Sequence, residues 1–231
     1  MLPGSGAQAS FTVGGIEIIV ARLDLGHEVI DALAASLSGA EQQRAARFHL
    51  ERDRRRFIAA RAQLRELIAA RLTVPPQAVE LVYGRHGKPA LAQGDLQFNL
   101  SRSGELAAYA FARGCGIGID IEAIRAVPDA DAIAGRIFSR RENDAYVALE
   151  PRERTIGFLN GWTRKEAFVK ALGGGLSIPL DSFDVTLAPG ATARILRVGS
   201  TPGEEARWRL ESFLPAPGFV AAVVSERRRL N

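Results

Sequence analysis

A long amphipathic helix with short strands after it sets the main limit on how this chain can fold. Apolar side chains fall on one stripe of a helix predicted over residues 53–72, namely Phe57, Leu64, Leu67, Ile68 and Leu72. Pro75 and Pro76 end this helix. Short β-rich segments separated by glycine-containing turns come next, at residues 79–83, 96–100, 106–112 and 116–121. Strands in hairpins beside a helix are typical of the α+β class.

The remaining segments keep this mixed order. Two capping-box patterns predict helix starts, Ser38 with Glu41 and Ser139 with Glu142. Other expected elements are a β-rich segment at 15–25, helices at 28–37 and 153–172, and strands at 183–187, 193–198, 207–213 and 219–225. The stretch 123–131 is looser and is expected to link two halves of the chain. We therefore predict an α+β fold.

The charge balance favours an anionic partner. The 231 residues carry a net charge of +4, and the sequence pI is near 9.7. The expected partner is a phosphate-bearing ligand, an acidic protein or a nucleic acid. With 47% hydrophobic and 24% charged residues, the chain is long enough for one large domain or two packed halves.

Cysteine content and hydropathy indicate a cytoplasmic protein. The single cysteine, Cys115, excludes an internal disulfide and a metal site built from several cysteines. No apolar stretch approaches the roughly 18 residues of a membrane-spanning helix, and the first residues do not resemble a signal peptide. We expect a soluble cytoplasmic protein that does not contact membranes.

Lysine is scarce in this sequence. The 30 basic residues include only three lysines, Lys88, Lys165 and Lys170. Where arginine is the usual cation, a lysine suggests a position that requires a compact ammonium. On composition alone, chance is the alternative explanation.

Two acidic residues share one face at the end of the strand predicted from residue 116. Alternate strand residues point the same way, so Asp120 and Glu122 project together. Neighbouring carboxylates repel each other unless a cation lies between them, and Mg²⁺ accepts few carboxylates while keeping sites for phosphate oxygens and water. The pair predicts a Mg²⁺ site, with two solvated acids as the alternative.

A carboxylate and an ammonium lie one turn apart on the helix predicted over residues 153–172. Glu166 and Lys170 face the same way on this helix. Together they could bind a metal and a phosphate. The alternative is an ordinary surface ion pair, which would contribute about 0.3–0.5 kcal/mol.

Residues 84–106 carry further candidate phosphate ligands. Lys88 precedes Pro89 in a glycine-rich turn, and Ser101 and Arg102 precede Gly104. A hydroxyl, a guanidinium and nearby backbone N–H groups can form a phosphate cradle. Turns of this composition are frequent, so an ordinary turn is the alternative.

An arginine run lies before and within the long helix, at Arg44, Arg47, Arg52, Arg54, Arg55, Arg56, Arg61 and Arg65. This density fits nucleic-acid binding, a polyphosphate clamp or a solvated face. The interleaved aromatic residues of single-strand binding surfaces are missing, since Phe48 and Phe57 fit the core. Arg61 shares a helix face with Arg54 and with Arg65, so this face could reach the candidate phosphate ligands.

Taken in order, these segments resemble the 4′-phosphopantetheinyl transferase family, in the larger monomeric type that primes non-ribosomal peptide and polyketide synthases. The shared motifs are Arg44-x-x-x-Phe48, Gly87-Lys88-Pro89, Phe98-Asn99-Leu100-Ser101-x-Ser103-Gly104, Gly118-Ile119-Asp120-Ile121-Glu122 and Trp162-x-x-Lys165-Glu166-Ala167-x-x-Lys170-Ala171. They span residues 44–176, and the last two together are specific. All three lysines fall inside the motifs.

The resemblance implies a pseudo-twofold fold of two similar α/β halves, with coenzyme A in the cleft between them. Residues 1–112 would form the half that binds the nucleotide end. Residues 113–231 would carry the metal and the catalytic helix.

The resemblance also implies roles for the motif residues. The implied ligands of Mg²⁺, with Mn²⁺ as another candidate, are Asp120, Glu122 and Glu166. The implied ligands of the nucleotide end are Arg44, Lys88, Pro89, Ser101 and Arg102, to which the helix spacing adds Arg61. Lys170 would contact the phosphates, and Lys165 would either stabilise the leaving phosphate or serve the structure. Arg102 stands where the family usually has histidine, and arginine can still bind a phosphate.

The implied reaction moves phosphopantetheine from coenzyme A to a serine of an acidic apo carrier protein, and 3′,5′-ADP leaves. Glu166 is the candidate acceptor of the serine proton, and Lys170 would neutralise phosphate charge. Two alternatives remain open: a different coenzyme A or nucleotide enzyme, and a basic nucleic-acid-binding module. The second would leave the three acids and three lysines unexplained.

Overall fold

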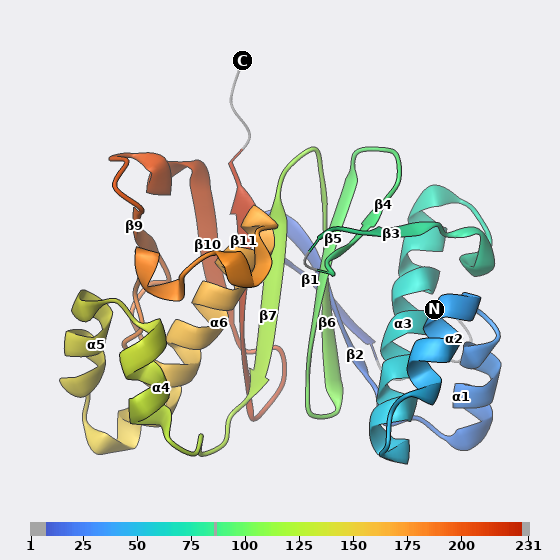
Figure 1. Ribbon diagram of the computed structural model, residues 1–231, viewed down its shortest axis with the longest axis horizontal. Helices are drawn as coiled ribbons and strands as arrows, with labels where there is room; N and C mark the ends of the chain where they lie inside the picture. Colours follow the sequence, from blue (N-terminus) through green and yellow to red (C-terminus); the bar gives the residue numbers. More distant parts are fainter. Residues whose placement is uncertain (1–7, 86, 228–231) are drawn as a thin grey trace.

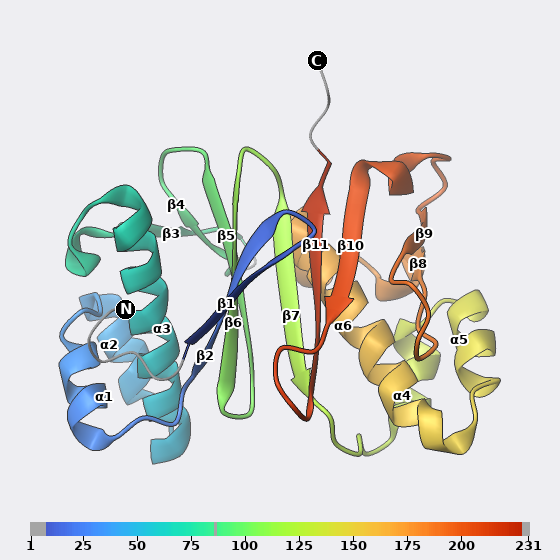
Figure 2. The same cartoon turned by 180° about the vertical axis from the view of Figure 1, so that it is seen from behind.

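The computed structural model describes residues 8–85 and 87–227, which form two antiparallel sheets lying next to each other (Figure 1). The first sheet has the order β1-β2-β6-β5, formed by Gln8–Val13, Ile16–Arg22, Leu106–Arg113 and Leu96–Ser103. The second has the order β10-β11-β7, formed by Trp208–Phe213, Phe219–Glu226 and Ile117–Ala123. Strands β5 and β7 meet where the two sheets adjoin (Figure 2).

Helices cover the outer side of each sheet. The helices of the first half are α1 (His27–Ala34), α2 (Gly39–Ala46) and α3 (Glu51–Leu72). Those of the second half are α4 (Ala130–Ile137), α5 (Arg140–Val147) and α6 (Arg154–Leu172). Two small sheets pair β3 (Leu81–Tyr83) with β4 (Pro89–Leu91), and β8 (Phe183–Val185) with β9 (Ile195–Val198). No helix within the described ranges combines the length and apolarity needed to cross a bilayer.

The strands are apolar on both faces because each sheet packs against helices on one face and against the other sheet on its second face. On β2, Ile19 and Ala21 belong to the core shared with α3, whereas Ile18 and Val20 belong to the core between the two sheets. Ile119 of β7 lies in this second core. The alternation of strand side chains thus produces a helix–sheet–sheet–helix arrangement of layers.

Helix α6 lies directly on strand β7 because β7 has a glycine at the crossing point. A Cβ atom on Gly118 would lie 2.0 Å from the backbone oxygen of Ala167 and 2.5 Å from the backbone nitrogen of Ala171. Any larger residue would push the helix away. This contact sets the distance between the helix that carries Glu166 and the strand that carries Asp120.

The two halves contain equivalent buried ion pairs. Glu41 at the start of α2 lies 2.6 Å from Arg65 on α3. Glu142 at the start of α5 lies 2.7 Å from Lys165 on α6. Each cation also donates to two backbone carbonyls of the chain that follows its helix. This correspondence supports the expectation of two similar halves.

Most predicted elements are confirmed within a few residues, including both capping boxes. The pattern did not reveal strand β1, which turns into β2 through Gly14 and Gly15, both at positive φ. It also missed β4 and helix α4. The expectation that the stretch after β7 links the two halves is wrong, because β7 already pairs with β11 of the second sheet. This stretch connects β7 to α4 within the second half and ends at Asp129.

Candidate active-site cleft

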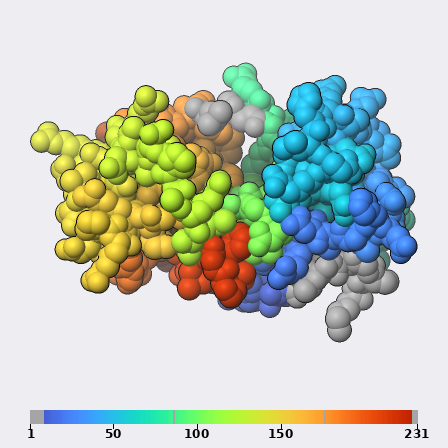
Figure 3. Space-filling model, turned by 90° about the horizontal axis from the view of Figure 1, so that it is seen from below, coloured from blue at the N-terminus to red at the C-terminus, as the bar shows by residue number. Residues whose placement is uncertain are grey.

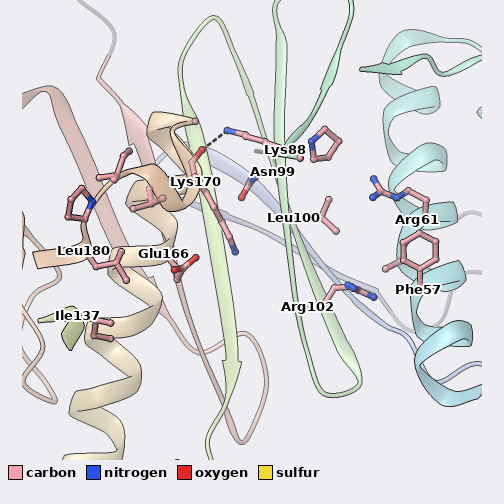
Figure 4. A pocket seen from close by; sticks show the side chains of 18 of the residues that line it. Phe57, Arg61, Lys88, Asn99, Leu100, Arg102, Ile137, Glu166, Lys170 and Leu180 are labelled. Atoms are coloured by element: carbon pink, nitrogen blue, oxygen red, sulfur yellow. Dashed lines mark hydrogen bonds between the residues drawn. The ribbon is translucent and has the colours of Figure 1, made fainter. Parts of the chain in front are cut away.

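A cleft of about 640 Å³ lies between the two halves. Figure 3 shows the hollow between α4, in yellow-green, and α3, in cyan. The first half contributes Arg44, Phe57, Arg61, Lys88, Asn99 and Arg102 to its walls. The second half contributes Ile137, Glu166, Val169, Lys170, Ile178 and Leu180. The first-half wall therefore carries several cations beside apolar side chains, and the other wall combines apolar side chains with Glu166, Lys170 and Arg136 (Figure 4).

Three arginines gather around one aromatic ring at the first-half wall. The guanidinium carbons of Arg44, Arg61 and Arg102 lie 5.6, 5.7 and 5.9 Å from the centroid of the Phe57 ring. Desolvation lowers the pKa of Arg102, and the positive charges of Arg61 and Arg44 lower it further. Nη1 of Arg61 is buried and has no hydrogen-bond partner among the described residues. An anion bound here would relieve the repulsion and satisfy the free donor.

Two carboxylates, Asp120 and Glu122, stand at alternate positions of β7, and Asp120 contacts the cleft residue Lys170. Oδ1 of Asp120 accepts hydrogen bonds from Lys170 Nζ at 2.6 Å and from Ser101 Oγ at 2.7 Å. Oδ2 of Asp120 is buried without a hydrogen-bond partner in the described part of the chain. Oε2 of Glu122 accepts a hydrogen bond from Ser103 Oγ at 2.7 Å. Each carboxylate is thus held through one oxygen.

Glu166 completes an acidic group with these two residues. Burial raises the pKa of Glu166, and Asp120 and Glu122 raise it further, against the opposite effect of Lys170. Burial also raises the pKa of Glu122, with a contribution from Asp120. Among the described residues, no three carboxylate, histidine or cysteine side chains already surround one point as metal ligands. The acids are close enough to repel one another, so a cation near them would be stabilising.

Lys88 connects the two halves across the cleft. Its Nζ donates to the backbone oxygens of Ile117, at 2.9 Å, and of Lys170, at 2.6 Å (Figure 4). Burial lowers the pKa of Lys88 to about 8, and the charge of Lys170 contributes. The lysine therefore brings positive charge to the cleft and also ties the turn before β4 to β7 and α6.

Comparison with known proteins identifies the family. The model for the 4′-phosphopantetheinyl transferase superfamily matches residues 116–224, and the model for the 4′-phosphopantetheinyl transferase N-terminal region matches residues 26–113. The chain is 36% identical over 205 residues to the 4′-phosphopantetheinyl transferase HetI of Nostoc sp., covering 87% of this chain and 83% of that protein. This chain belongs to the 4′-phosphopantetheinyl transferase superfamily.

Other relatives agree with this assignment. The transferase is 30% identical over 200 residues to the 4′-phosphopantetheinyl transferase Sfp of Bacillus subtilis, covering 86% of each chain. It is 28% identical over 207 residues to the human L-aminoadipate-semialdehyde dehydrogenase-phosphopantetheinyl transferase, covering 82% of this chain and 67% of that protein. The resemblance drawn from the motifs is confirmed, and the protein is an enzyme of the larger type that makes holo carrier proteins.

The structure brings most of the predicted site residues of this transferase together. Those that line the cleft are Arg44, Arg61, Lys88, Pro89, Arg102, Glu166 and Lys170. Ser101 and Asp120 are buried beneath it and connected to Lys170 by hydrogen bonds. Ser101 therefore contacts the acidic group through Asp120, whereas the resemblance implied a nucleotide ligand.

Lys165 does not lie in the cleft of the transferase. Its side chain is 0% exposed and pairs with Glu142, and Nζ donates to the carbonyls of Leu180 and Phe183. All three ammonium protons are thus directed at protein atoms in the interior. Of the two roles considered for Lys165, the contacts match the structural one.

Several arginines of the run are neutralised by neighbouring acids. Arg54 pairs with Glu51 at 2.8 Å, and Arg56 pairs with Asp24 at 2.7 Å. Arg65 is buried against Glu41 and does not reach the cleft. The expectation that the whole face of Arg54 and Arg65 reaches the cleft is wrong, because only Arg61 of that face does. Local ion pairing also argues against a nucleic-acid surface along α3.

Sequence reasoning missed three contributors to this site. Phe57 was assigned to the core, and its ring also supports the three arginines of the cleft. Asn99 and Ser103 lie inside a family motif, at alternate positions to Ser101. That period of two on a strand was the available signal, because it places all three side chains on one face. Nothing in the sequence indicated that this face meets β7.

Proposed function

We propose that this transferase takes the phosphopantetheine arm from coenzyme A, in a reaction that depends on Mg²⁺, and attaches it to a serine of an apo carrier protein. The observation that carries this proposal is the distribution of charged side chains between the two walls of the cleft. A cluster of three arginines lies at one wall, and Glu166 and Lys170 lie at the other, above buried Asp120. Coenzyme A has a matching distribution of charge, with a 3′-phosphate at one end and a pyrophosphate further along.

The arginine cluster is suited to the nucleotide end. Arg44, Arg61 and Arg102 would share the 3′-phosphate, since guanidinium groups bind phosphate oxygens in pairs. Lys88 and Pro89 also line the cleft, and Lys88 contacts the backbone of Lys170, so they would contact the middle of the nucleotide. Lys170 would face the pyrophosphate.

The acidic group suits a Mg²⁺ ion chemically. The unpartnered buried oxygen of Asp120 is available to a cation. Burial raises the pKa values of Glu122 and Glu166, and the neighbouring carboxylates add to this effect. Mg²⁺ commonly takes only one or two carboxylates and fills its other positions with water and phosphate oxygens. Asp120, Glu122 and Glu166 would hold it, with Mn²⁺ as a substitute. When bound, the ion would withdraw charge from the pyrophosphate.

The chemical step is a displacement at phosphorus. The oxygen of the carrier serine forms a bond to the β-phosphorus of coenzyme A, and the bond from this phosphorus to the bridging oxygen breaks. The bridging oxygen leaves with 3′,5′-ADP. Glu166 would accept the serine proton, because its raised pKa makes it a better base than an ordinary carboxylate. Lys170 would balance the charge of the leaving group.

The two halves would divide these tasks. Residues 1–112 would anchor the nucleotide end, and residues 113–231 would carry the metal ligands and the helix with Glu166. The net charge of +4 would favour acidic acyl or peptidyl carrier proteins. One chain would build the whole cleft by itself, so the enzyme would act as a monomer. Its expected location is the cytoplasm.

The decisive experiment incubates the protein with an apo carrier protein, coenzyme A and Mg²⁺. The carrier should gain the mass of phosphopantetheine, and EDTA should prevent this gain. Asp120→Ala and Glu166→Ala should abolish transfer while keeping a cooperative thermal transition. The proposal is falsified if a folded form of either variant retains activity near that of wild type.

A further inference from the structure

Strands β5 and β7 are joined by side chains instead of a backbone ladder. The two strands belong to different sheets and lie side by side where the sheets meet. Three contacts from alternate positions of β5 connect them: Asn99 Oδ1 accepts from the backbone N–H of Ile119 at 2.9 Å, Ser101 Oγ donates to Asp120 Oδ1 at 2.7 Å, and Ser103 Oγ donates to Glu122 Oε2 at 2.7 Å. We call these three contacts the β5–β7 side-chain ladder.

The two serines of the ladder make equivalent hydrogen bonds to the two carboxylates, Asp120 and Glu122. Ser101 contacts one oxygen of Asp120, and the other oxygen, Oδ2, is buried without a partner among the described residues. Ser103 contacts Oε2 of Glu122, and the contacts of the described residues include no hydrogen bond to Oε1. In both cases a serine of β5 uses one carboxylate oxygen and leaves the second available.

The contact of Ser103 has a defined direction. Its Oγ accepts a hydrogen bond from the backbone N–H of Ala123 at 3.0 Å while it donates to Glu122. A hydroxyl has one proton, so the proton of Ser103 is directed at Glu122. Asp120 has Lys170 as a further partner, whereas Ser103 is the one side chain that donates to Glu122 within the described residues. Glu122 is also only half-buried, so packing alone restrains it less than Asp120.

We propose that Ser103 is a positioning residue for Glu122. Its hydroxyl holds Oε2 against β5, so that Oε1 is presented together with Oδ2 of Asp120 to a divalent cation. A glutamate without this contact would lose rotamer freedom upon metal binding and would bind the ion less tightly. The inference rests on the proposed function, because the cation is the one proposed for the transfer reaction.

Four proteins test this role: wild type, Ser103→Ala, Ser103→Thr and the control Ser36→Ala. Ser36 is a fair control because it is buried, donates a single hydrogen bond to Leu33 O at 2.8 Å and lies outside the cleft. The first readout is Mn²⁺ binding to the protein without coenzyme A, followed through the electron paramagnetic resonance signal of free Mn²⁺. The second is the Mg²⁺ concentration that gives half-maximal transfer at saturating coenzyme A.

Ser103→Ala should weaken Mn²⁺ binding about tenfold, the lower end of losses reported when partners of metal ligands are removed. It should raise the half-maximal Mg²⁺ concentration by a similar factor and leave the KM for coenzyme A at saturating Mg²⁺ unchanged. Ser103→Thr keeps a hydroxyl and should bind Mn²⁺ like wild type, as should Ser36→Ala.

Three results would overturn the role of Ser103. They are wild-type protein that does not bind Mn²⁺, a Ser103→Ala variant with unchanged Mn²⁺ binding, and equal losses in Ser103→Ala and Ser103→Thr. The Mn²⁺ titration does not require transfer. If wild type binds Mn²⁺ but cannot use coenzyme A, the proposed function fails, and the comparison of Ser103→Ala with wild type still decides this inference.

Discussion

Lys165 lies 2.7 Å from Glu142 in the interior of the second half, and this pair matches the one between Arg65 and Glu41 in the first half. In each half the acidic residue comes from a capping box and the cation from the long helix that packs on the sheet. The pair joins a short helix to a long one and to the chain that follows it. A lysine inside the most specific motif therefore holds the fold together.

Lys165→Met should lower the free energy of unfolding by about 3–5 kcal/mol, because it leaves the Glu142 carboxyl buried without its cation. The double variant Lys165→Met, Glu142→Gln should recover part of this loss, since no charge then remains unpaired. Chemical denaturation measures both effects. Turnover per folded molecule should stay close to wild type. A stable Lys165→Met variant without turnover would instead assign Lys165 to the chemistry.

Gly118→Ala should disturb both stability and transfer. Its Cβ would lie 2.0 Å from the backbone oxygen of Ala167, so α6 must move away from β7. Such overpacking costs about 1–3 kcal/mol or more, and the movement would separate Glu166 from Asp120. Gly39→Ala is the control, because a Cβ there meets nothing within 4 Å. Thermal unfolding and a transfer assay should show lower stability and lower activity for Gly118→Ala than for Gly39→Ala. Equal Tm and equal activity in the two variants would contradict the close contact of α6 and β7.

Glu66→Gln should stabilise the protein at neutral pH. Oε2 of Glu66 is buried without a partner among the described residues, and burial raises the pKa of this carboxyl above 4.5. The folded state therefore binds the proton of Glu66 more tightly than the unfolded state does. As a result, the free energy of unfolding falls as pH rises through the raised pKa of Glu66. The Tm of Glu66→Gln should exceed that of wild type at pH 7 and approach it at pH values below 4.5. Glu80→Gln, at an exposed position, should show no such pH-dependent gain.

Arg102→Ala should discriminate between coenzyme A and its 3′-dephospho form. A charge-assisted phosphate contact contributes about 1.5–3 kcal/mol, which corresponds to a roughly ten- to hundredfold weaker affinity for coenzyme A. Binding of 3′-dephospho-coenzyme A should change little. Titration calorimetry with both ligands measures the difference, and Arg52→Ala, with an exposed side chain, is the control. Equal losses for the two ligands would remove Arg102 from the 3′-phosphate.

Local patterns in the sequence were sufficient for much of this description. The α+β class, both capping boxes and the two long helices follow from apolar periodicity and from hydrogen bonds over three or four residues. The pairing of Asp120 with Glu122 follows from the period of a strand. These features depend on neighbours in the chain, so the sequence alone determines them.

Tertiary structure decided where the charged side chains go. Lys165 and Glu166 are adjacent in the sequence, yet one is buried against Glu142 and the other lines the cleft. Adjacent helix residues point about 100° apart, and only the packing of α6 on β7 decides which of them faces the interior. The β5–β7 side-chain ladder joins residues about 20 positions apart without a backbone ladder. No local periodicity records such contacts, because they exist only once two separate sheets have packed together.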